Sequence, residues 1–94
     1  MITSLVKIAQ GLWVVKPAQV RMARAALNWS LAQLAEAAGM HRNTISNFET
    51  GRYAGEPDKI AAMRQALEKA GVEFIPENGG GAGVRLKKRD EASV

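Results

Sequence analysis

Residues 21–52, RMARAALNWSLAQLAEAAGMHRNTISNFETGR, decide how this chain folds. Ser30 and Gln33 have the spacing of a capping box, in which each side chain accepts a hydrogen bond from the other residue's backbone N–H at a helix start. Four apolar residues follow at the spacing of one helix face: Leu31, Leu34, Ala35 and Ala38. Gly39 then ends the helix, because glycine readily adopts a left-handed backbone. The stretch therefore predicts a helix over 31–38.

The same stretch continues into a second short helix, from Arg42 to Phe48. Met40 points inward just before it, Ile45 and Phe48 form its buried side, and Thr50-Gly51 ends it. Its remaining positions are polar: Arg42, Asn43, Thr44, Ser46 and Asn47. Two short helices joined by a tight glycine turn, the second with a polar face, form a helix-turn-helix arrangement. The major groove of double-stranded DNA is about 12 Å wide and accepts one such helix.

Two further helices flank this stretch. Pro17 opens one over 17–27, since the first turn of a helix tolerates the missing N–H of proline. Its apolar residues recur on one face: Val20, Ala23 and Leu27. Pro57 and Asp58 open the other, where the acid suits the positive end of the helix dipole, and Gly71 ends it. The apolar face of this last helix consists of Ile60, Met63, Leu67 and Ala70.

The ends of the chain differ from this helical centre. Residues 1–15 form an apolar arm, and the pattern leaves open whether it is helix or strand. Residues 72–75 (VEFI) and 84–87 (VRLK) predict the two strands of a β-hairpin over 72–88. The glycines of NGGGAG between them favour a flexible turn over a phosphate-binding loop, because a dinucleotide site needs glycines that open a helix after a buried strand. Residues 89–94 are expected to form a flexible tail.

Composition limits the chemistry of the chain. Its 94 residues carry 13 lysines and arginines against 9 aspartates and glutamates, a net charge of +4 that favours a polyanionic partner. Without cysteine, and with His41 as the single histidine, neither a disulfide framework nor a metal or cofactor site is expected. Neither a paired set of carboxylates nor a Ser–His–acid set is present, so an enzyme is not expected.

The sequence also bears on where the protein is located and on the role of its basic C-terminal residues. The apolar runs are too short for a membrane span, and the first residues lack the basic start of a signal peptide, so a cytoplasmic protein is expected. Four basic residues near the C-terminus are either solvated or a phosphate-contacting arm: Arg85, Lys87, Lys88 and Arg89.

The central motif resembles the Cro/XRE family of phage and bacterial regulators. Seven features of the family pattern occur in register: Arg24, Ser30, Leu34-Ala35, Ala38-Gly39, Ile45, Phe48-Glu49 and Gly51. The resemblance covers roughly 17–70, more than half of the chain. It implies a mainly α, lambda-repressor-like bundle of four to five short helices, here followed by the small C-terminal β-hairpin. The DNA-binding domain would occupy residues 16–71.

The resemblance also implies roles for individual residues. The arginine of the first helix and the glutamate that closes the recognition helix form a pair in the family, so Arg24 should meet Glu49. The base-reading positions correspond to Arg42, Asn43 and Asn47, with Ser46 a weaker candidate. Contacts to the DNA backbone correspond to His41, Thr44, Thr50 and Arg52, and secondarily to Ser30. One position departs from the pattern: Leu31 replaces a glutamine that contacts phosphate in many members.

These observations predict a sequence-specific regulator that binds double-stranded DNA, a dimeric repressor on a palindromic operator with half-sites one helical turn apart. Its dimer contact would lie outside the motif, in the apolar arm with Trp13 or in the hairpin. Trp13 packs either within its own chain or on a second subunit, and Trp29 covers the core, with an interface role as the less favoured alternative. Two other functions stay open: the antitoxin of a toxin–antitoxin pair, and a protein-interaction module, such as an antiactivator, on the same scaffold. In the last case Arg42, Asn43 and Asn47 would be a solvated helix face.

Overall fold

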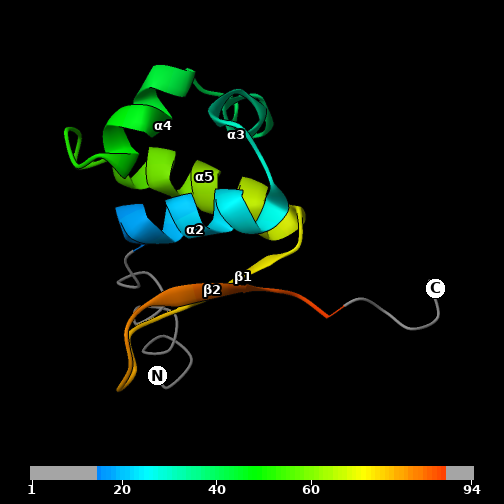
Figure 1. Cartoon of the computed structure of the whole chain (residues 1–94). Helices are drawn as coiled ribbons and strands as arrows, with labels where there is room; N and C mark the ends of the chain where they lie inside the picture. Colours follow the sequence, from blue (N-terminus) through cyan, green and yellow to red (C-terminus); the bar gives the residue numbers. More distant parts are fainter. Residues whose placement is uncertain (1–14, 89–94) are drawn as a thin grey trace, which may run out of the picture.

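The computed structural model describes residues 15–88, and within this range the chain forms four helices followed by two strands (Figure 1). In chain order these are α2 (Pro17–Leu27), α3 (Leu31–Ala38), α4 (Arg42–Glu49), α5 (Pro57–Lys69), β1 (Val72–Ile75) and β2 (Gly83–Leu86). The fold is a mainly helical bundle with a small antiparallel hairpin, as the sequence predicts. The expected arm and tail lie outside the described residues, apart from Val15.

Local signals set the ends of α2 and α3, and both predicted ranges are confirmed. Pro17 occupies the first position of α2, and Asn28 ends it in a left-handed conformation with φ of 58°. At the start of α3, the Ser30 hydroxyl accepts from the Gln33 backbone N–H at 3.1 Å, and the Gln33 side chain accepts from the Ser30 N–H at 2.8 Å. Gly39 ends α3 with φ of 70°.

The later elements differ slightly from their predicted bounds. The helix expected over Arg42–Phe48 includes Glu49 as well, because the Thr50 N–H still donates to the Ser46 carbonyl at 3.1 Å. The returning strand spans Gly83–Leu86 rather than residues 84–87, since Ile75 pairs with Gly83 and Val72, the first residue of β1, pairs with Leu86. A glycine adds no side chain to the alternating pattern, so the sequence places this strand one residue too late.

The hairpin belongs to the same core as the helices. Figure 1 shows it below α2 and α5, on the side away from α3 and α4. Val72 and Phe74 of β1 face inward and are buried beside the buried residues of all four helices. The core consists of Val15, Val20, Ala23, Leu34, Ala35, Ile45, Phe48, Met63, Ala66, Leu67, Val72 and Phe74. None of the helices within residues 15–88 is long and apolar enough to cross a membrane.

A buried glutamine connects α2 to the hairpin. The Gln19 side chain is fully buried, and its Nε2 donates to the carbonyls of Ile75 at 3.1 Å and Gly83 at 2.9 Å. Its Oε1 accepts from the Lys16 backbone N–H at 2.8 Å. Because Ile75 and Gly83 face each other across the two strands, this one amide fixes both strands against the start of α2.

Candidate nucleic-acid interface

The turn between α3 and α4 is short and held by backbone hydrogen bonds. The Met40 N–H donates to the Ala35 carbonyl at 3.0 Å, which continues the end of α3 after Gly39. The Met40 side chain is half-buried against the core, and His41 is the N-cap of α4. These contacts set the direction in which α4 leaves α3.

Helix α4 has one buried side and one exposed polar side. Ile45 and Phe48 are 0% and 2% exposed, so they attach the helix to the core. The predicted base-reading residues Arg42, Asn43 and Asn47 are exposed, and Ser46 is half-buried. Within residues 15–88, the side chains of those three exposed residues have no hydrogen bond or ion pair. Their donors and acceptors are therefore available to a ligand.

The residues predicted to contact the DNA backbone lie at both ends of α4. His41 is exposed at its start, and Thr44 is half-buried in its first turn. After its end, the Thr50 hydroxyl donates to the Ser46 carbonyl at 2.9 Å, and the Arg52 N–H donates to the Asn47 carbonyl at 2.8 Å. The chain thus folds back on the last turn of α4.

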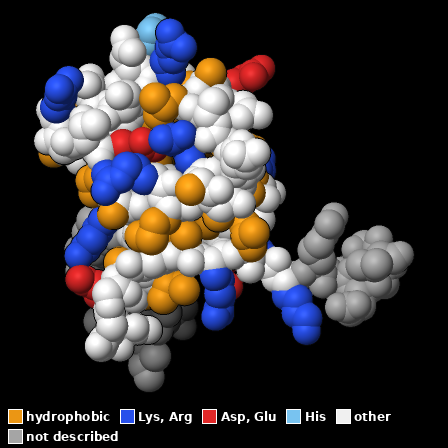
Figure 2. All heavy atoms as spheres, in the orientation of Figure 1, with side chains coloured by type: hydrophobic (Ala, Val, Ile, Leu, Met, Phe, Trp, Pro, Cys, Tyr) orange, Lys and Arg blue, Asp and Glu red, His pale blue; other side chains and the backbone are white. Residues whose placement is uncertain are grey.

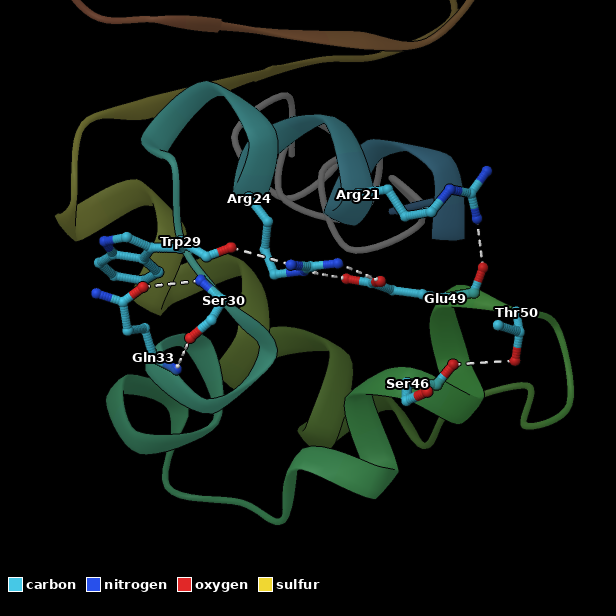
Figure 3. Close-up of polar contacts among 8 residues, drawn as sticks. All are labelled: Arg21, Arg24, Trp29, Ser30, Gln33, Ser46, Glu49 and Thr50. Atoms are coloured by element: carbon cyan, nitrogen blue, oxygen red, sulfur yellow. Dashed lines mark hydrogen bonds and ion pairs between the residues drawn. The ribbon is translucent and has the colours of Figure 1, made fainter.

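An ion pair holds the C-terminal end of α4 to α2 (Figure 3). Arg24 Nε and Nη2 donate to the two carboxylate oxygens of Glu49 at 2.7 and 2.9 Å. Arg24 Nη1 donates to the Trp29 carbonyl at 2.9 Å, so the same guanidinium also fixes the segment before α3. The Glu49 side chain is 5% exposed and that of Arg24 is 21% exposed. The hydrogen bond with Glu49 raises the pKa of Arg24, and the Glu49 charge raises it further, against the effect of burial.

A second arginine, which the sequence motif did not single out, holds the same helix end. Arg21 Nη1 donates to the backbone carbonyl of Glu49 (Figure 3). The last carbonyls of a helix lack intrahelical partners and carry the negative end of the helix dipole, which a guanidinium stabilises. The signal in the sequence was the spacing: Arg21 precedes Arg24 by three residues and therefore lies on the same side of α2.

The start of α3 differs from the Cro/XRE pattern that the sequence resembles. Ser30 is exposed, and its hydroxyl caps α3 by accepting from Gln33. Leu31, where many Cro/XRE-type sequences have glutamine, is half-buried and packs against the core, as does Trp29. No group of three or more metal-ligating side chains occurs among the described residues.

Comparison with known proteins supports this description. The sequence model of a protein family described as "Helix-turn-helix domain" matches residues 18–73. This span includes almost all of α2, all of α3 to α5 and the first two residues of β1. No curated protein matches the chain.

Proposed function

The chain belongs to the helix-turn-helix domain family, and we propose that it is a sequence-specific regulator that binds double-stranded DNA through α4. The observation that carries the proposal is the exposed side of α4, where Arg42, Asn43 and Asn47 have no partner within residues 15–88. On this proposal the protein acts by binding, in the cytoplasm, and not as an enzyme.

The proposed base contacts follow from side-chain chemistry. An arginine matches the two acceptors of guanine in the major groove, and an asparagine matches the acceptor and donor of adenine. Arg42 would therefore read guanine, Asn43 and Asn47 would read adenine, and Ser46 would contribute a weaker contact. Each well-formed bidentate contact discriminates against the wrong base by about 1–3 kcal/mol.

Contacts to the DNA backbone would set the position of α4 in the groove. We assign this role to His41 and Thr44 at the start of the helix and to Thr50 and Arg52 after its end. Ser30 would add a secondary contact at the start of α3, where unpaired backbone N–H groups and the helix dipole favour a phosphate. With Leu31 packed on the core, no side-chain phosphate contact is expected from that position.

We also propose that the chain is of the Cro/XRE type, on the register of Arg24, Ser30, Gly39 and Glu49. A single module of this size buries about 600–1,000 Å² of protein surface on DNA, so tight binding requires a dimer. The dimer would act as a repressor on a palindrome with half-sites about 34–36 Å apart. Its contact would lie in the N-terminal arm or in the 72–88 hairpin.

The proposal is tested by selecting binding sites from a random duplex library with the purified protein. A palindrome should be enriched, and its spacing would give the dimer geometry. Arg42→Ala with Asn43→Ala should abolish the sequence preference and leave the thermal melt nearly unchanged. Lys69→Ala, which removes an exposed cation from the end of α5, is the control and should keep the preference. Specific binding that survives the double change would refute the role of α4.

The second candidate is a protein-interaction module on the same scaffold, such as an antitoxin or an antiactivator. Leu31 favours this candidate, because an apolar side chain stands where many Cro/XRE-type sequences have a glutamine that contacts a DNA phosphate. DNA binding through phosphates must weaken steeply with salt. A flat salt dependence, or no enrichment by a folded protein, would favour this candidate. A neighbouring toxin gene would then distinguish the antitoxin.

A further inference from the structure

Two large hydrophobic side chains are exposed within residues 15–88: Met22 on α2, at 38%, and Leu86 on β2, at 52%. They belong to elements that lie against each other, since the Gln19 amide of α2 binds the Gly83 carbonyl of β2 at 2.9 Å. Figure 2 shows hydrophobic side chains gathered in a row over α2, on the side that faces the viewer.

The geometry of the two elements brings Leu86 beside the second half of α2. The Gln19–Gly83 contact joins α2 and β2 near their starts, and from there the two elements run in the same direction (Figure 1). A strand rises about 3.3 Å per residue and a helix 1.5 Å, so Leu86 lies about 10 Å beyond Gly83, level with Ala25 and Ala26. Leu86 pairs with the buried Val72 and therefore points to the inner face of the hairpin, toward α2.

The outward side of α2 has no charged residue along this line. Its residues recur at the spacing of one helix face: Ala18, Met22, Ala25 and Ala26. Ala25 and Ala26 are exposed, and Ala18 is half-buried. Leu86 lies level with Ala25 and Ala26 by the rise of the two elements, and we call these five residues the α2–β2 face. The side of a helix that faces away from the core usually carries polar residues. An apolar surface there indicates that another segment or molecule packs on it.

We propose that residues 1–14 of the same chain cover the α2–β2 face. This segment is mostly apolar, and Lys7 is its only charged side chain. It joins the described structure at Val15, which is 2% exposed and precedes Lys16, the N-cap of α2. The cover is therefore tethered at one end of the face. The proposal goes beyond DNA binding and does not rest on it.

The segment is long enough to span the length of α2 either as a helix or when extended. Helix α2 has 11 residues and is about 16 Å long. Fourteen residues span about 21 Å as a helix and up to about 46–50 Å when extended. The tether also removes the entropy cost of bringing two molecules together, because a short linker gives an effective concentration in the millimolar range, on the order of 10⁻³ M.

Charge favours this segment over a second copy of the chain. Exposed cations border the α2–β2 face, with Arg21 on α2 and Lys87 and Lys88 after β2. Two copies that met through this face would bring the same cations toward one another, and like charges at an interface are unfavourable. The N-terminal segment adds few charges of its own. If it covers this face, the hairpin becomes the remaining candidate for the dimer contact.

The chain contains no cysteine, so a single introduced cysteine can be labelled specifically. A nitroxide spin label is attached to the Gln10→Cys variant, and the NMR amide signals of this uniformly ¹⁵N-labelled protein are recorded without DNA. The label should broaden the signals of Met22 and Leu86 most and that of Asn43, in α4, least. A mixture of spin-labelled unenriched protein with ¹⁵N-labelled unmodified protein should show no such broadening, because the segment covers its own chain.

Matched variants complete the design. Met22→Lys with Leu86→Lys should release the segment and remove the broadening. Ala61→Lys with Gln65→Lys, which adds the same two charges at exposed positions of α5, should not. The proposal is overturned if the label affects all amides equally, if the double lysine variant retains the broadening, or if the broadening is seen in the mixture, which would show a second copy. The amide spectrum of each variant reports directly that it is folded.

Discussion

Replacement of Arg24 by methionine should be among the most destabilising single changes in this chain. In residues 15–88, both carboxylate oxygens of Glu49 are bonded by Arg24 alone, and the Glu49 side chain is 5% exposed. Arg24→Met would leave that carboxylate buried without a partner. Removal of one partner from a buried pair costs about 3–5 kcal/mol. Because Arg24 is itself 21% exposed, water already weakens the pair, so we expect the lower end of the range.

Two further variants separate the charge pair from its surroundings. Glu49→Gln keeps an acceptor for Arg24, and Arg24 also retains its bond to the Trp29 carbonyl. This variant should therefore lose less free energy of unfolding than Arg24→Met, about 1–2 kcal/mol. Arg24→Met combined with Glu49→Met removes both charges and should cost less than Arg24→Met alone, since replacement of a whole buried pair by apolar groups is often nearly neutral.

The assay is urea unfolding of the four proteins, supported by thermal melts. A loss of about 3 kcal/mol corresponds to a fall of about 12–24 °C in Tm for a domain of this size. The reasoning fails if Arg24→Met lowers Tm by less than about 4 °C, the effect of about 1 kcal/mol. It also fails if the double variant is less stable than Arg24→Met, because the pair would then not be the reason for the loss.

Three other predictions concern the hairpin and the turns. Gln19→Leu should destabilise by at least about 2 kcal/mol in urea unfolding, because two strand carbonyls lose their donor; an unchanged midpoint would contradict the role of this amide. Gly55→Ala should cost more than Gly51→Ala in the same measurement: both glycines have positive φ, but only at Gly55 would a Cβ meet side-chain atoms, at 2.8 Å. The hydrogen bond from Arg85, and then its charge, lowers the pKa of Glu73 from its usual 4.5. The stabilising contribution of this pair is therefore complete above pH 4.5 and should be lost as the pH falls through the lowered pKa; Glu73→Gln should remove this part of the acid dependence of Tm, and an identical profile would contradict it.

The parts of the fold that the sequence predicts well are those set by neighbouring residues. Pro17, the Ser30–Gln33 capping box and Gly39 act within one helical turn, and the bounds of α2 and α3 follow from them. The hairpin pattern is similarly local, and its one error, at Gly83, arises where there is no side chain to read. The Arg24–Glu49 pair was expected from the family resemblance rather than from any spacing in the chain.

The contacts that the sequence could not predict connect distant segments. Gln19 and Gly83 are 64 positions apart, and Arg21 and Glu49 are 28 apart. A glutamine next to an apolar stripe resembles any surface residue until the hairpin is placed over it. The acceptor of Arg21 is a backbone carbonyl, which no residue type reveals. Such contacts depend on the tertiary arrangement, so they become visible only in the structure.

These contacts give α2 a central position between the two halves of the molecule. Arg21 and Arg24 hold the C-terminal end of α4, whereas Gln19 holds both strands of the hairpin. Gln19 and Arg24 are about 7.5 Å apart along one helix axis. The hairpin and α4 are thus both bonded to the same short stretch of α2. The hairpin, although mostly outside the matched family span, is therefore part of the support that holds α4 in place.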